Sequence, residues 1–215
     1  MLKKNLNKKK LIRGCLNEAI ICSVVPKATK IFKSSFKKIF GIRCIELGKE
    51  VRAPIKNCYS PPGKVGQDRL VNAVAGIHLY GKPLIIVDFG TCITFDCISA
   101  KGQYLGGLIM PGIDMTLSAL YKKTALLPRL KMIHPLALIG RNTKESIRSG
   151  MYYGFLGGCE FVIKQVKRKL GKKTLVIGTG GYAKLFKTKI KSIDIFDSNL
   201  TLQGLCLIYR EKRGK

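Results

Sequence analysis

The chain has 215 residues, enough for one domain or two small ones, and 46% of them are apolar, so it can bury a core. Its formal net charge of +28 points to nucleic acids, anionic membrane surfaces or anionic small molecules as partners, although lysines spread over the whole length equally fit a compositional bias. No apolar stretch has the roughly 20 residues of a membrane span, and the N-terminal residues lack the apolar region and cleavage site of a signal peptide, which predicts a cytoplasmic protein.

The cysteines indicate neither a zinc site nor a disulfide framework. There are eight of them and two histidines, without any C-x-x-C pair. Zinc sites and disulfide-rich domains are recognised by such regular spacings. We therefore expect buried, reduced thiols. Carboxylates are scarce, with 12 in all, so each of them is a candidate for a specific role.

The first part of the chain predicts strands and helices in alternation. Residues 19–25 are typical of a buried strand that stops before a proline. Residues 27–41 have apolar side chains on one helical face and lysines on the other, which fits a helix that covers a sheet or, less commonly, one on a membrane surface. A strand over 42–47 and a proline-containing loop follow. A helix then begins at Asp68 and ends at Gly81.

The rest of the chain predicts a hairpin and further alternating elements. Residues 84–98 read LIIVDFGTCITFDCI, two apolar strands joined by a tight turn. Asn142 and Glu145 have the spacing of a capping box, so we expect a helix from there to Gly171. The other predicted elements are a strand over 103–112, a helix over 114–120, a strand over 173–178, a glycine turn over 178–183 and a C-terminal helix from 198. The class is α/β with a mixed sheet.

The turn of the hairpin is a candidate phosphate site. Backbone N–H groups around Gly90 can face an anion, and Thr91 adds a hydroxyl donor. The carboxylate of Asp88, at a strand end, can hold a cation that bridges to phosphate oxygens. An ordinary turn with a capping aspartate fits the same letters, so D-x-G-T by itself is a weak signal.

Two charged residues at the start of the helix that precedes this hairpin are candidates for substrate chemistry. Asp68 stands where the first N–H groups of a helix are unsatisfied, so it is either an N-cap or a base beside a bound anion. Arg69 offers a planar fork that suits a substrate carboxylate, or it is a surface charge. Both alternatives stay open at this point.

A third candidate is the glycine turn GTGGYA. Gly178, Gly180 and Ala183 satisfy the pattern G-x-G-x-x-A after a predicted strand. Too little chain follows for a dinucleotide-binding unit, and no strand with an acidic end stands at the required distance. A nucleotide can rest on this turn without the dinucleotide fold.

Five motifs occur in a fixed order: VGQDRLVNAVAG, IVDFGTCITFD, GGLIMPG, GRNTKESIRSG and VIGTGGYA. Together they closely resemble type III pantothenate kinase, the bacterial enzyme that starts coenzyme A synthesis, from about residue 19 to the C-terminus. The resemblance implies the actin and sugar-kinase-like fold, in which two related ribonuclease-H-like α/β domains with mixed sheets close over ATP. Residues 1–80 would form an incomplete first domain with the substrate turn, and residues 81–215 the second domain.

The resemblance also implies roles for individual residues. Asp68 would be the general base that takes the proton from the pantothenate hydroxyl, and Asp88 would bind a monovalent cation, potassium or ammonium. Thr91 would contact ATP phosphate, with Mg²⁺ accompanying ATP. The positions that match pantothenate-binding residues are Tyr59, Gly66, Gln67, Asp68, Arg69 and Thr143, and those near the adenosine are Gly180 and Gly181. A homodimer is implied, and phosphoryl transfer needs little more than such positioning and a base.

The resemblance has one gap, at the N-terminus. Family members begin with a first phosphate hairpin, D-x-G-N-T, whose aspartate helps to hold magnesium, whereas this sequence begins MLKKNLNKKKLIRGC. We therefore expect a first domain truncated at its N-terminus, with Ile20 to Val25 poorly covered. Three alternatives follow: an ordinary kinase whose start is misassigned, a catalytically weak remnant, or a basic nucleic-acid-binding or regulatory protein on the same scaffold.

Overall fold

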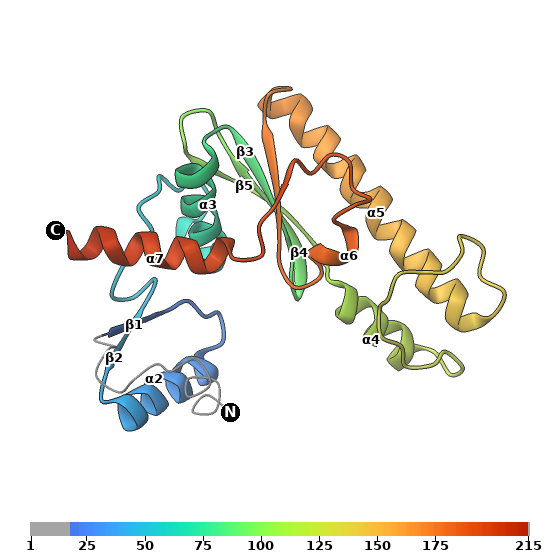
Figure 1. Cartoon of the computed structure of the whole chain (residues 1–215), viewed down its shortest axis with the longest axis horizontal. Coiled ribbons are helices and arrows are strands. Elements are labelled where there is room, and N and C mark those ends of the chain that lie inside the picture. The colour runs from blue at the N-terminus through green and yellow to red at the C-terminus, as the bar shows by residue number, and fades with distance from the viewer. Residues whose placement is uncertain (1–17, 215) are drawn as a thin grey trace.

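The computed structural model describes residues 18–214, so the basic N-terminal segment lies outside the described residues. A five-stranded sheet with the order β5-β4-β3-β6-β7 forms the centre of the molecule (Figure 1). Its strands are β3 (Leu84–Phe89), β4 (Cys92–Ile98), β5 (Tyr104–Pro111), β6 (Leu175–Thr179) and β7 (Ile195–Phe196). Strand β3 is antiparallel to β4 and parallel to β6, which confirms the predicted hairpin and mixed sheet.

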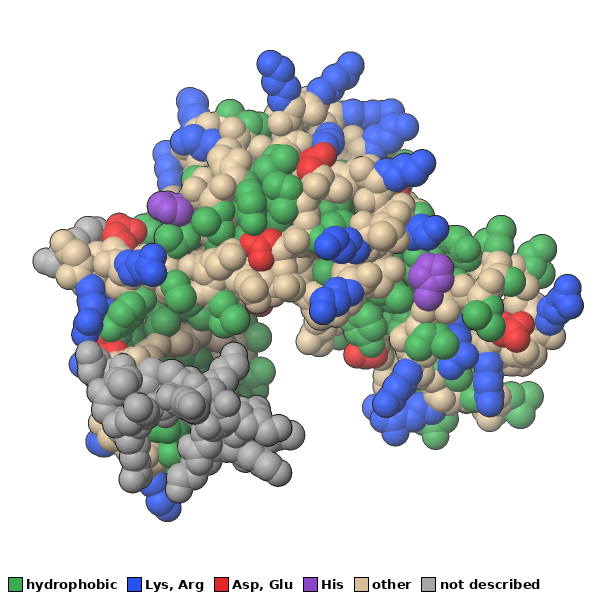
Figure 2. All heavy atoms as spheres, in the orientation of Figure 1, with side chains coloured by type: hydrophobic (Ala, Val, Ile, Leu, Met, Phe, Trp, Pro, Cys, Tyr) green, Lys and Arg blue, Asp and Glu red, His purple; other side chains and the backbone are tan. Residues whose placement is uncertain are grey.

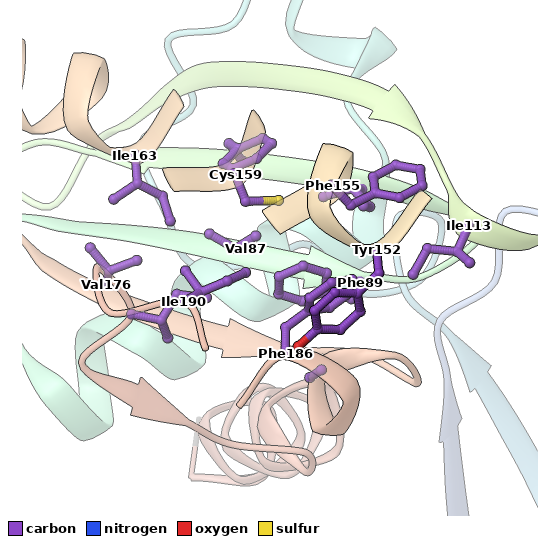
Figure 3. Packing of buried hydrophobic residues seen from close by; sticks show 14 of the residues in the cluster. Val87, Phe89, Ile113, Tyr152, Phe155, Cys159, Ile163, Val176, Phe186 and Ile190 are labelled. Atoms are coloured by element: carbon purple, nitrogen blue, oxygen red, sulfur yellow. The ribbon is translucent and has the colours of Figure 1, made fainter. Parts of the chain in front are cut away.

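One face of this sheet carries the largest apolar core. Alternate residues of β3, such as Val87 and Phe89, point into it and pack against Tyr152, Cys159 and Phe186 (Figure 3). The helices on this face are α4 (Ile113–Lys123), α5 (Thr143–Leu170) and the short α6 (Ala183–Phe186). This core therefore packs one whole face of the sheet, the face away from the helix that precedes β3.

The opposite face of the sheet packs against α3 (Gln67–Tyr80). The other alternate residues of β3, Leu84 and Ile86, are fully buried there. Helix α7 (Leu200–Arg213) crosses α3, and Gly204 gives it room, since a side chain at that position would be 2.7 Å from a methyl group of Val71. Asp88, two residues beyond Ile86, therefore lies on the α3 side of the sheet.

A second, two-stranded parallel sheet lies beside α7 at the lower left of Figure 1. It consists of β1 (Glu18–Ile21) and β2 (Arg43–Glu46), covered by α2 (Pro26–Phe40), and the short helix η1 (Pro62–Lys64) follows in the connection to α3. The contact of α2 with β2 confirms that the amphipathic helix covers a sheet. Tyr209 of α7 donates a hydrogen bond of 2.8 Å to Glu18, which fastens this sheet to the rest of the chain.

The first predicted strand is shorter than expected. It ends at Ile21, because the Ser23 hydroxyl accepts the backbone N–H of Val25 at 3.1 Å and starts the turn into α2. Strand β1 is only half-buried, and Val24 and Val25 are 64% and 53% exposed. The expected poor cover of this segment is therefore present.

The expectation of buried thiols was only partly right. Cys44 and Cys159 are buried, but Cys58 and Cys206 are exposed, and Cys15 lies outside the described residues. Exposure follows from position, because Cys58 lies in the loop before α3 and Cys206 on the outer side of α7. Within residues 18–214, none of the helices has both the length and the apolar character that crossing a membrane requires.

Candidate active site

The N-terminus of α3 carries the first acidic side chain of the site. The helix begins at Gln67 with Gly66 as its N-cap, so the N-cap interpretation of Asp68 is wrong. Asp68 lies in the first turn, where its Oδ1 accepts the backbone N–H of Arg69 at 3.0 Å. A side chain at position 66 would collide with this oxygen, which explains the glycine. The carboxylate is thus held at the positive end of the helix dipole.

Asp88, at the end of β3, is the second acidic side chain. Its Oδ2 accepts a hydrogen bond of 3.2 Å from Asn72 Nδ2, and Asn72 Oδ1 in turn accepts the Thr201 hydroxyl at 2.7 Å. Burial raises the pKa of Asp88, the Asn72 hydrogen bond lowers it in part, and the negative charge of Asp68 raises it further. The two carboxylates therefore lie close enough to repel each other.

The glycine turn after β6 lies against the end of β3. Gly180 has φ +95°, and a side chain there would be 2.7 Å from the backbone of Phe89 and would collide with Asp88. The Tyr182 N–H donates to the Phe89 carbonyl at 3.1 Å. Helix α6 has only 4 residues, so this G-x-G-x-x-A does not open a dinucleotide-binding unit. The sequence had already argued against such a unit.

The hairpin turn between β3 and β4 completes this edge. Thr91 is exposed, and its backbone lies against Gly112. Any side chain at position 112 would collide with the Thr91 carbonyl. The Tyr182 hydroxyl donates to Asp114 Oδ1 at 2.5 Å and so joins the glycine turn to the start of α4. Two turns and a helix start thus surround the end of β3, and Thr91 is exposed there.

Arg69 is not a surface charge, and that alternative is wrong. It is 7% exposed, and its Nε donates to Asp96 Oδ1 at 2.6 Å. The Tyr104 hydroxyl donates to the same oxygen at 2.8 Å. Burial raises the pKa of Asp96 to about 6, against the opposing charge of Arg69. Arg69 Nη2 is buried without a hydrogen-bond partner in the described part of the chain.

Tyr59 and Gln67 flank this ion pair. The Tyr59 ring lies 6.5 Å from the Tyr104 ring and covers Gly106, where a side chain would be 3.3 Å from it. The Gln67 side chain packs over Gly48, where a side chain would be 2.8 Å away. The loop before α3 therefore packs against strand β5, and the first turn of α3 packs against the loop after β2.

Thr143 is the one candidate that the single chain does not bring to this surface. It is the first residue of α5, and Figure 1 shows that end of α5 at the opposite side of the molecule from α3. The capping box is confirmed, because Asn142 Oδ1 accepts the Glu145 N–H at 3.0 Å. Beside Thr143 is an open surface depression lined in part by Leu127, Arg141 and Ile147.

Sequence reasoning missed four residues that organise the site. Asn72 could have been found from its position four residues after Asp68 on the same helical face. Asp96 could have been found from the alternation in β4, where Ile93 and Phe95 are apolar and Asp96 faces the other side. Tyr104 and Thr201 have no such signal, since their contacts join segments 8 and 129 residues apart.

The sheet order, the hairpin and the glycine turn at the end of β3 define an α/β protein of the actin and sugar-kinase-like class. The fold resembles that of a Campylobacter jejuni protein described as a conserved Baf family transcriptional activator, with a TM-score of 0.61, 19% identity, and coverage of 100% of this chain and 89% of that chain.

The sequence comparisons give the family. The model for type III pantothenate kinase matches residues 1–165. The type III pantothenate kinase of Dehalococcoides mccartyi strain BAV1 is 43% identical over 197 residues, 92% of this chain and 75% of that protein. That of Persephonella marina is 43% identical over 202 residues, 94% of this chain and 78% of that protein. The chain belongs to the type III pantothenate kinase family.

Proposed function

We propose that this chain transfers the γ-phosphoryl group of ATP to the hydroxyl of pantothenate and so forms 4'-phosphopantothenate, the first step of coenzyme A synthesis. Family membership supports the reaction. The observation that carries it to particular residues is the approach of the Asp68 and Asp88 carboxylates, at the N-terminus of α3 and the end of β3. A base and a phosphate site are the parts that phosphoryl transfer requires.

Asp68 is the general base in this proposal. Only its Oδ1 accepts a hydrogen bond from the described residues, so Oδ2 can accept a proton. The pantothenate hydroxyl gives its proton to Asp68 while its oxygen forms a bond to the γ-phosphorus, and the bond from phosphorus to the bridging oxygen of ADP breaks. The exposed Thr91 hydroxyl donates to a phosphate oxygen of ATP, which enters with Mg²⁺ as co-substrate, and Gly180 and Gly181 accommodate the adenosine.

Asp88 fits a monovalent cation. Its carboxylate is partly buried and next to Asp68, and the raised pKa shows that the single hydrogen bond from Asn72 does not compensate its charge. Potassium or ammonium beside Asp88 would stabilise the ionised carboxylate and offset the repulsion from Asp68. When bound, the cation would supply positive charge near the phosphates.

Pantothenate occupies the surface around the first turn of α3. The backbone of Gly66 and Gln67, the Tyr59 ring and the guanidinium of Arg69 border this surface, and Arg69 is the group that suits the substrate carboxylate. The family implies a division of the chain, with the substrate turn in residues 1–80 and the phosphate turns in residues 81–215. We include that division in the proposal.

The chain acts as a cytoplasmic homodimer in this proposal. The segment around α4, α5 and their connection exposes large apolar side chains, of which Leu126, Leu136 and Ile139 are 93%, 97% and 80% exposed. Figure 2 shows apolar side chains gathered on this lobe, at the right of the view. Such a patch suits a protein interface. A second copy packed on it would bring Thr143 toward the partner's substrate surface, which Thr143 cannot reach within its own chain.

The test is turnover by the purified chain with ATP, Mg²⁺, potassium and pantothenate, measured by ³¹P NMR of the product. We expect Asp68→Asn to lower kcat by about 100-fold or more, because general base catalysis contributes about 10² to 10⁴. Asp194→Asn, which changes a carboxylate that accepts the Val176 N–H away from the site, is the matched control. A wild-type rate no higher than that of Asp68→Asn would contradict the proposal.

A further inference from the structure

The guanidinium of Arg69 is held on one side only. Of its donors, Nε is used by Asp96, and the Arg69 Cζ lies 5.9 Å from the centre of the Tyr104 ring. Nη2 is buried and has no partner among the described residues. A buried charged donor without a hydrogen bond is costly, and native structures retain one where something else binds it.

The acceptor Asp96 is itself fixed from three directions. It is fully buried, its Oδ1 accepts from Arg69 and from the Tyr104 hydroxyl, and its Oδ2 accepts from the Thr94 hydroxyl at 3.3 Å. A carboxylate with this many donors cannot rotate freely. Because Arg69 is tied to it through Nε, the plane of the guanidinium is fixed as well.

A glycine of β5 lies close to Nη2. A side chain at Gly107 of β5 would be 2.9 Å from Nη2, and would also collide with the carbonyl of Phe95. Gly107 itself is exposed, so solvent reaches this part of the strand. The buried Nη2 thus lies next to a stretch of β5 backbone that is exposed at Gly107.

We propose that Asp96 and Tyr104 are positioning residues that hold the Arg69 guanidinium by its Nε so that Nη2, over Gly107, binds the carboxylate of the substrate. This inference rests on the proposed function and adds the residues that set its substrate specificity. A guanidinium can donate to a second carboxylate because its N–H groups lie on different edges of one plane. Asp96 accepts from Nε, and the substrate carboxylate accepts from Nη2.

The orientation of the Arg69 guanidinium can be distinguished experimentally from the mere presence of its positive charge. If Arg69 were only a nearby charge, a lysine or a loosened arginine would serve almost as well. If its orientation matters, removal of the Tyr104 hydroxyl weakens binding of the carboxylate substrate although Arg69 and Asp96 both remain. ATP, which binds at the turns around Thr91 and Gly180, is unaffected in that case.

The experiment compares Tyr104→Phe with Tyr80→Phe. Both variants remove a phenol hydroxyl that donates to an aspartate, since Tyr80 donates to Asp197 at 2.9 Å away from Arg69. We expect Tyr104→Phe to raise the KM for pantothenate about tenfold, the effect of losing one hydrogen bond to a charged group. The KM for ATP and kcat should change less than about threefold, and Tyr80→Phe should change neither KM. Equal changes in both KM values, or no change for Tyr104→Phe, would overturn the inference.

A second readout does not depend on turnover. The ¹⁵N NMR signal of Arg69 Nε–H should be visible in the wild-type chain, shift on titration with sodium acetate, and shift less in Tyr104→Phe. Asp96→Asn should lose the slow exchange of this proton. If acetate shifts the signal but pantothenate does not bind, the proposed function fails while the positioning role holds. If acetate leaves the signal unchanged in the wild-type chain, the positioning role fails.

Discussion

At the scale of single residues, the ion pair of Arg69 and Asp96 is the central feature of the described chain. Both side chains are buried, with exposed fractions of 8% and 0%. A buried ion pair contributes little net stability, because removing two charges from water offsets their attraction. Its value here lies in geometry, since the pair sets where the guanidinium of Arg69 points.

The pH dependence of stability should report on Asp96. Its pKa is 3.8 in a model peptide and about 6 in the folded chain, raised by burial. The folded chain therefore binds the Asp96 proton more tightly than the unfolded chain, so this contribution to stability is complete below about pH 4 and is lost as pH rises through about 6. We expect the free energy of unfolding of wild type, relative to Asp96→Asn, to fall across this window.

Urea unfolding of both chains at intervals between the two pKa values gives this difference directly. The comparison with Asp96→Asn removes the contributions of other carboxylates, such as Glu50, whose pKa is lowered by its hydrogen bonds with Lys33 and Arg43. Parallel curves for the two proteins would show that Asp96 keeps an ordinary pKa in the folded chain.

At the scale of secondary structure, local signals determine α5 almost completely. Asn142 caps its first turn through the Glu145 N–H, and the Glu145 carboxylate accepts the Arg141 N–H at 2.9 Å. At the other end, Gly171 has φ +106° and closes the helix. Both ends were predictable because each signal lies within a few residues of the boundary that it sets.

The capping box should have a measurable effect on stability. We expect Asn142→Ala to lower the free energy of unfolding by about 1 kcal/mol, since it leaves N–H groups of the first turn without an acceptor. Asn199→Ala is the matched control, because Asn199 precedes α7 but its side chain makes no cap hydrogen bond. Urea unfolding measures both. A loss no larger for Asn142→Ala than for Asn199→Ala would contradict the prediction.

The candidate site was predictable only in part, because only some of its residues are marked by signals within a few positions of them in the sequence. Asp68, Asp88 and Thr91 stand at element ends, which turn residues and apolar runs mark in the sequence. Burial of Arg69 was not predictable, because it depends on the register that places Asp96 opposite Ile86 and hence on the α3 side of the sheet. Contacts between distant elements leave no local pattern.

At the scale of the whole molecule, the lobe formed by α4, the following connection and the start of α5 stands out from the sheet (Figure 1). Its exposed apolar side chains lie among lysines and arginines, which Figure 2 shows on this lobe as well as over the upper face. A strongly basic surface opposes association through charge repulsion. A dimer of this chain, if it forms, needs an apolar contact to offset this repulsion. The three most exposed large apolar side chains of residues 18–214 lie on this lobe.

Charged substitutions on the lobe should dissociate the proposed dimer. We expect the double variant Leu136→Glu and Ile139→Glu to sediment as a monomer, because it would bury charge in the interface. The control is Leu202→Glu, at a 63% exposed position on α7. Since Thr143 would then lack its partner, pantothenate binding should weaken while ATP binding is retained. A variant that still sediments as a dimer would show that the copies meet elsewhere.

The hydrogen bonds from Thr201 to Asn72 and from Asn72 to Asp88 have a consequence for the order of assembly. A ribosome makes Asn72 and Asp88 early and Thr201 some 129 residues after Asn72. The amide that orients Asp88 is therefore itself unsupported through most of translation. A nascent chain therefore completes the hydrogen bonds around Asp88 only after α7 has left the exit tunnel.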